Sequence, residues 1–136
     1  MLAVLAAGAV AVSGRRRRRV RGVARITPAE LRALIESGEP VTIVDLRSVI
    51  QVERSGAKIP GALVMHPAEA ELHLRGTPRD HHLVFYCACP NEASSARLAL
   101  KLSQLGFDSV RPLEGGFDAW RNQGYPVDAI PKEGTY

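Results

Sequence analysis

The sequence has only two cysteines among its 136 residues, and they stand two positions apart, at Cys87 and Cys89. A disulfide across so short a loop would be strained and would close almost no chain. The spacing therefore argues against a disulfide-stapled secreted scaffold, and a reducing compartment fits better.

The body of the chain also lacks an excess of basic residues. Seven arginines and no acidic residue lie in the first 25 positions, and they account for the net charge of +4. Beyond them, 11 of the 18 basic residues remain against 14 acidic ones. We therefore expect no basic face and no nucleic-acid partner.

The N-terminal apolar run, Leu2 to Val12, is too short to span a membrane by itself. A helix of that length covers only ~18 Å of a ~30 Å hydrocarbon core. Arginines follow this run, as they do where a membrane helix emerges on the cytoplasmic side. We predict that residues 1–25 form an apolar, arginine-rich leader, membrane-proximal or disordered. It would be the end of a longer membrane segment, an interfacial anchor on anionic lipid through residues 1–19, or a disordered start. The favoured alternatives leave the rest of the chain as a cytoplasmic domain, with a possible membrane tether.

Short apolar segments alternate with helical ones through most of the chain. Strands are predicted at residues 41–46, 62–65, 83–87 and 109–113. Helices are predicted at residues 28–37, 67–74, 94–105 and 115–124, and the stretch after residue 46 is expected to be irregular. This alternation predicts one α/β domain over residues 26–130, with a mostly parallel central sheet flanked by helices on both faces, and a C-terminal tail over residues 131–136.

Three predicted strands end in residues that can carry chemistry. Asp45 and Arg47 lie at the end of the first, the cysteine pair at the end of the third, and Glu114 with Gly115 and Gly116 after the last. The carboxyl ends of parallel strands meet at one edge of a sheet, so we expect these groups to lie together. A thiol in a loop that opens a helix has a lowered pKa, which favours a cysteine nucleophile.

The sequence has no recognisable metal pattern. His81 and His82 precede the strand that the cysteines follow, which places them at its opposite end, and the spacing matches no structural zinc site. We predict no metal and no cofactor.

Several motifs together resemble a rhodanese-like domain. They are "TIVDLRS", "IPGALV", "FYC", "LGF", "VRPLEGGFDAW" and "GYPV", in that order over residues 26–127. The arginine-rich exit followed by "ARITPAEL" and "YCACPNEAS" is more narrowly similar to the rhodanese module attached to DedA-type membrane proteins. The resemblance implies a sulfurtransferase that moves sulfane sulfur through a cysteine persulfide. Its partners would be a small sulfur donor and a thiol or cyanide-like acceptor, or a protein thiol.

The resemblance implies a catalytic cysteine, but the two ends of its loop disagree on which one. If the end of the predicted strand is matched to the family's motif, the catalytic cysteine is Cys87. If residues are counted back from Gly106, at the end of the following helix, the catalytic cysteine is Cys89. We favour Cys87, because a buried strand end is held by the sheet whereas a loop absorbs insertions. Cys89 would then lie in the same pocket, placed to attack the persulfide or share its sulfur. The implied substrate-binding loop is Ala88, Cys89, Pro90, Asn91, Glu92, Ala93 and Ser94, and the implied structural support is Asp45, Arg47, Gly115 and Gly116.

Glu92 makes thiosulfate a doubtful natural donor, since a carboxylate in the loop opposes a dianion by on the order of a kcal/mol. Two other functions compete. One is a non-catalytic or relay module serving a membrane protein. The other is a thiolate phosphatase or arsenate reductase, which needs an arginine that closes the loop. Ala93 or Ser95 stands at that place, depending on the cysteine, so the sequence argues against the second.

Overall fold

The computed structural model describes residues 19–20 and 22–131. Its main sheet has four strands, all parallel, in the order β5-β3-β6-β7. The strands are β3 (Val41–Asp45), β5 (Leu63–Val64), β6 (His82–Tyr86) and β7 (Val110–Pro112). The predicted α/β class with a parallel central sheet is confirmed.

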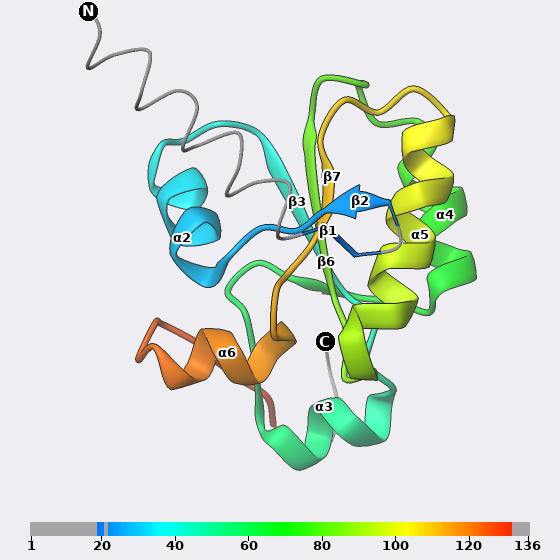
Figure 1. Cartoon of the computed structure of the whole chain (residues 1–136). Helices are drawn as coiled ribbons and strands as arrows, with labels where there is room; N and C mark the ends of the chain where they lie inside the picture. Colours follow the sequence, from blue (N-terminus) through cyan, green and yellow to red (C-terminus); the bar gives the residue numbers. More distant parts are fainter. Residues whose placement is uncertain (1–18, 21, 132–136) are drawn as a thin grey trace, which may run out of the picture.

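Helices cover both faces of this sheet, as predicted (Figure 1). The helices α2 (Pro28–Glu36) and α6 (Gly116–Asn122) lie on one side, and α4 (Pro67–Leu74) and α5 (Ala93–Gln104) on the other. A further helix, α3 (Val49–Ser55), lies below the ends of the strands in this view. Alternate residues of β6 enter different cores. Leu83 and Phe85 pack with the α4 and α5 side, and Val84 and Tyr86 with the α2 and α6 side. This alternation is what a strand buried on both faces requires.

Two small antiparallel pairs complete the fold, and neither was predicted. One joins β1 (Arg19–Val20) to β2 (Val23–Ala24), and the other joins β4 (Ala57–Lys58) to β8 (Asp128–Ala129). The strands β1 and β2 fall inside the range predicted as a leader, and Val23 is buried in the core on the α5 side. Two-residue strands leave no periodic pattern to detect.

The stretch after residue 46 is not irregular, and that prediction was wrong. It forms α3, which begins at a capping box in which Ser48 and Gln51 bond each other's backbone N–H groups. The helix ends at Gly56, whose φ of 71° is left-handed. The signal, a serine followed three residues later by a glutamine, was present in the sequence.

No helix within residues 19–20 and 22–131 has the length and apolar character needed to cross a membrane. The predicted leader lies for the most part at residues 1–18, outside the described residues. The tether therefore stays a prediction.

Tyr86, at the end of β6, joins the sheet to the chain before β5. Its ring is fully buried, and its hydroxyl oxygen accepts the Ile59 N–H at 3.1 Å. Burial, followed by the charge of Asp45, raises the pKa of Tyr86 far above its ordinary value, so the hydroxyl stays neutral.

Tyr86→Phe is expected to lower the free energy of unfolding by ~1–3 kcal/mol, because it leaves the Ile59 N–H buried without its acceptor. Urea denaturation measures this. Tyr125→Phe is the matched control, since Tyr125 packs through its ring against Trp120 at 5.1 Å between centroids. Equal effects of the two substitutions would contradict the role given to the Tyr86 hydroxyl.

Candidate active site

The carboxyl ends of the parallel strands surround a cavity of about 450 Å³. It is lined by Arg47, Gln51, Ser55, Cys87, Ala88, Cys89, Pro90, Glu92, Gly115, Gly116, Phe117 and Asp118. The predicted meeting of the three strand ends is therefore what the structure contains. The sequence did not predict Gln51 and Ser55 as lining residues, because they come from α3. Nor did it predict Phe117 and Asp118, which follow the two glycines at the start of α6.

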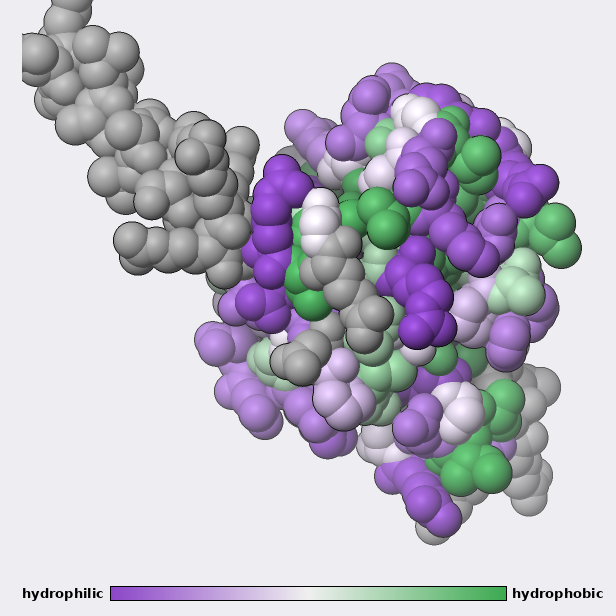
Figure 2. Space-filling model, turned by 45° about the vertical axis from the view of Figure 1, so that its right-hand side comes forward, coloured by the Kyte–Doolittle hydropathy of each residue, from purple (hydrophilic) through white to green (hydrophobic). Residues whose placement is uncertain are grey.

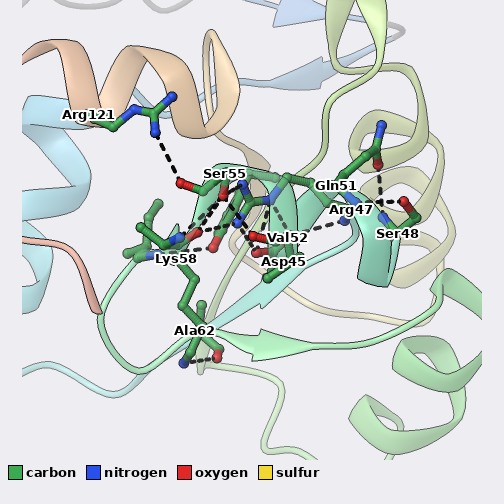
Figure 3. A network of polar contacts seen from close by, with 12 residues as sticks. Asp45, Arg47, Ser48, Gln51, Val52, Ser55, Lys58, Ala62 and Arg121 are labelled. Atoms are coloured by element: carbon green, nitrogen blue, oxygen red, sulfur yellow. Dashed lines mark hydrogen bonds and ion pairs between the residues drawn. The ribbon is translucent and has the colours of Figure 1, made fainter. Parts of the chain in front are cut away.

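Asp45 and Arg47 form a buried ion pair behind this cavity (Figure 3). The Asp45 carboxylate is fully buried and receives three guanidinium contacts of 2.7–3.1 Å. Arg47 also donates to the Ser55 hydroxyl and to the Ala57 carbonyl oxygen, each at 2.9 Å. Burial works against the guanidinium charge, but the hydrogen bonds and charge of Asp45 outweigh it and raise the pKa of Arg47. The pair thus connects the end of β3 to the end of α3.

The cysteine loop rests directly on the start of α6. A Cβ atom added to Gly116 would lie 2.7 Å from the Cys87 carbonyl oxygen, and the φ of Gly116 is 60°. Both the close approach and the left-handed backbone require glycine there. Gly116 therefore lets the backbone of α6 pack against the loop that holds the thiols.

Glu92 closes the same loop in an unusual conformation. Its φ of 51° makes it the one residue other than glycine with positive φ in the part of the chain that the structure describes. Its carboxylate lies 3.0 Å from the Arg25 guanidinium, and the Glu92 side chain is largely buried. Glu92 is therefore an ion-paired group, which the sequence alone did not predict.

The two thiols have different surroundings. Both are free; Cys87 is only 5% exposed, whereas Cys89 is half-buried. The Cys89 Sγ atom lies 3.0 Å from the Ser94 Oγ atom in the first turn of α5. The hydrogen bond with the Ser94 side chain has the largest effect and lowers the pKa of Cys89. Burial opposes this shift, whereas the Ser94 backbone, the Cys87 side chain and the charge of Arg97 lower the pKa further. Cys89 is thus the thiol that the helix start activates.

Other predicted site residues lie around this centre. Ser94 contacts Cys89 without lining the cavity, Ala93 begins α5, and Asn91 belongs to a short 3-10 helix, Pro90–Glu92. His82 lies at the far end of β6, where its ring contacts Ser109 and Glu39.

Ser94→Ala is expected to raise the pKa of Cys89, because the thiolate loses the hydrogen bond that lowers this pKa most. Alkylation of Cys89 by iodoacetamide should become severalfold slower at neutral pH, and its rate profile should move to higher pH. Peptide mapping by mass spectrometry distinguishes Cys89 from Cys87. Ser103→Ala, an exposed position on the same helix, is the control. An unchanged profile for Ser94→Ala would refute the role of this hydroxyl.

The site has the features that the sequence resemblance predicted. A cysteine ends a parallel strand, the loop after it leads into a helix, and a double glycine supports this loop. Residues 27–123 match the rhodanese-like domain family. The chain belongs to this family.

Rhodanese-like relatives match similar shares of this chain but different shares of their own length. It is 32% identical over 104 residues to the thiosulfate sulfurtransferase GlpE of Pseudomonas fluorescens, a match that covers 76% of this chain and 89% of GlpE. It is 31% identical over 135 residues to the thiosulfate sulfurtransferase-like protein SseB of Mycobacterium tuberculosis, covering 79% of this chain. The chain spans about half the length of SseB, 47%.

A solved structure from Rhodopseudomonas palustris, of a protein of unknown function described as a possible tyrosine phosphatase, has a similar fold. The TM-score is 0.63 at 34% identity, with 76% of this chain and 83% of the other covered.

Proposed function

We propose that this rhodanese-like domain is a sulfurtransferase that carries sulfane sulfur as a persulfide on one cysteine of its loop. The observation that carries the proposal is the Cys89 thiol at the start of α5, bonded to Ser94 and open to the cavity. The names of the GlpE and SseB relatives support the same class of reaction. No cofactor is needed, because the thiolate itself is the nucleophile.

Cys89 makes the first attack in this proposal, which was the alternative to Cys87 in the sequence analysis. Its greater exposure and lowered pKa support it. The thiolate attacks the outer sulfur of the donor, and the bond between that sulfur and the donor breaks. The electron pair leaves with the donor, as sulfite if the donor is thiosulfate. A thiol or cyanide then attacks the outer persulfide sulfur, and the cysteine thiolate leaves.

The test is intact mass spectrometry of the reduced protein after exposure to thiosulfate, 3-mercaptopyruvate and glutathione persulfide. We expect at least one donor to change the protein mass and to yield thiocyanate when cyanide is present together with the donor. If no donor produces thiocyanate or changes the protein mass, although both thiols react with iodoacetamide, the proposal fails.

Thiosulfate fits the site better than the sequence alone indicated. The Glu92 carboxylate is compensated by Arg25 at 3.0 Å, so it opposes an anionic donor less than a free carboxylate would. The name of the GlpE relative points to the same donor. We therefore include thiosulfate among the donors of the proposed reaction.

Arg25→Gln should reduce kcat/KM for thiosulfate roughly fivefold, since an uncompensated charge costs on the order of 1 kcal/mol. The loss should be smaller with the monoanion 3-mercaptopyruvate. Arg32→Gln, which breaks an exposed pair with Glu36, is the control. Glu92→Gln, which removes the opposing carboxylate, should instead raise kcat/KM for thiosulfate. Equal losses with both donors would refute the electrostatic explanation.

A relay to a protein thiol is a second candidate, supported by exposed apolar side chains beside the cavity. Val49 and Ile50 of α3 are 52% and 61% exposed and adjoin Gln51, which lines the cavity. Figure 2 shows apolar side chains exposed at the lower end of the molecule, where α3 lies in Figure 1. Slow turnover with small acceptors, and fast transfer to a protein thiol, would favour the relay.

Phosphatase or arsenate reductase activity is less well supported. Its oxyanion clamp would require an arginine in the loop, and residues 87–95 contain none. Phosphate release from an aryl phosphate is the direct measurement.

A further inference from the structure

The second thiol of the cavity has no part in the transfer just described. Cys87 and Cys89 line the same cavity, and only Ala88 separates them in the chain. Cys87 is nearly buried in the core that contains Phe85, while Cys89 is half-buried at the edge of that core. A small donor in the cavity therefore reaches Cys89 more easily than Cys87. Cys87 lines the cavity in which the Cys89 persulfide would form.

We propose that Cys87 resolves the persulfide formed on Cys89, closing a Cys87–Cys89 disulfide and releasing the transferred sulfur as hydrosulfide. This inference rests on the proposed function. It adds a second reaction to it, the reduction of sulfane sulfur to hydrosulfide by the two thiols of one chain.

The chemistry balances without an external oxidant. The Cys87 thiol loses its proton, and its sulfur attacks the inner sulfur of the Cys89 persulfide. A bond forms between the two Sγ atoms, and the bond to the outer sulfur breaks. That sulfur leaves with the electron pair as hydrosulfide. The two cysteine thiols have been oxidised to a disulfide, and the sulfane sulfur, which was the oxidant, has been reduced.

The chain permits this disulfide and makes it easily reduced. Two residues in extended conformation span at most ~7 Å, and a disulfide joins Cα atoms ~4.4–6.8 Å apart, so a modest bend of the loop is enough. Strained and accessible disulfides are the labile ones. Two equivalents of a low-molecular-weight thiol, or one dithiol, would return both cysteines to the free state found in the structure.

Both cysteines pack against the same hydrophobic core, the one on the α4 and α5 side of the sheet. Both also line the cavity. The two side chains therefore lie on the same side of the loop before any donor binds. The exposed residue between them, Ala88, leaves the loop room to adjust.

The experiment uses the full chain, reduced, freed of reductant and kept anaerobic, with one equivalent of thiosulfate or 3-mercaptopyruvate and no acceptor. We expect the wild type to lose the mass of two hydrogen atoms and to release one hydrosulfide per chain. Cys87→Ser should instead gain and keep the mass of one sulfur atom, with no hydrosulfide. Cys87→Ala is made in parallel in case the serine is poorly tolerated in the core, and Ala29→Ser on α2 serves as a remote control.

The outcomes separate this inference from the proposed function. If the wild type keeps one added sulfur atom as stably as Cys87→Ser does, the resolving role is wrong while the transferase proposal stands. Release of hydrosulfide by Cys87→Ser at the rate of the wild type would equally overturn it. If no variant reacts with either donor and none forms thiocyanate with any donor of the panel, the transferase proposal itself fails and the inference with it.

Discussion

Cys89→Ser is expected to lose persulfide formation and thiocyanate production entirely, because the hydroxyl that replaces the thiol is not ionised at neutral pH. The effect should be confined to chemistry. Cys89 is half-buried, and serine keeps a hydrogen-bonding group beside Ser94. Intact mass after donor treatment, followed by a cyanide chase, measures the loss.

The matched comparison is Cys87→Ser, which should still take up sulfur. Circular dichroism and urea denaturation should show that both variants fold. The reverse result, in which Cys87→Ser is inert and Cys89→Ser carries the sulfur, would restore the assignment predicted from the end of the strand. It would mean that position in the sheet outweighs the activation of Cys89 by the start of α5.

Asp45→Ala is expected to lower the free energy of unfolding by ~3–5 kcal/mol, which is the typical cost of leaving one member of a buried ion pair alone. Arg47, which is 6% exposed, would keep its charge without a carboxylate to balance it. The rings of Tyr86 and Phe117 would still lie against its guanidinium. Its bonds to Ser55 and Ala57 hold the end of α3, so Gln51 and the cavity wall should loosen as well.

Asp118→Ala is the control for this substitution. Asp118 pairs with Arg121 at 3.4 Å, but its side chain is 81% exposed, and such pairs contribute at most ~1 kcal/mol. Urea denaturation of both variants gives the comparison. Losses of similar size would show that the Asp45–Arg47 pair is no more than a surface pair. Replacing both Asp45 and Arg47 by apolar residues of similar volume should recover part of the stability.

Elements with strong local signals could be predicted from the sequence. The helix at Pro67–Leu74 begins with proline at its first position, and β6 is apolar after its first residue, so each lies within a residue of its predicted place. The capping box of α3 was an equally local signal that was not used. The pair β4–β8 joins segments far apart in the sequence, since Lys58 pairs with Asp128. The strands β1 and β2 are neighbours in the chain, but two residues per strand carry too little information to predict their pairing.

The site divides in the same way. Sequence order and strand pattern were enough to bring Arg47, the cysteine loop and Gly116 to one edge of a parallel sheet. They could not supply the Arg25–Glu92 pair, whose members are 67 positions apart. That contact exists only because the chain before α2 packs beside β7, where Ile26 forms a parallel bridge with Leu113.

The sequence by itself determined that this chain is an α/β domain of rhodanese-like pattern with a cysteine loop between a buried strand and a helix, because periodicity, caps and glycines act over a few residues. Only the tertiary structure decided how the two thiols differ. Burial of Cys87 and activation of Cys89 depend on how the loop lies between the core and α5. Solvation and hydrogen bonding, which set the reactivity of a thiol, are properties of that packing.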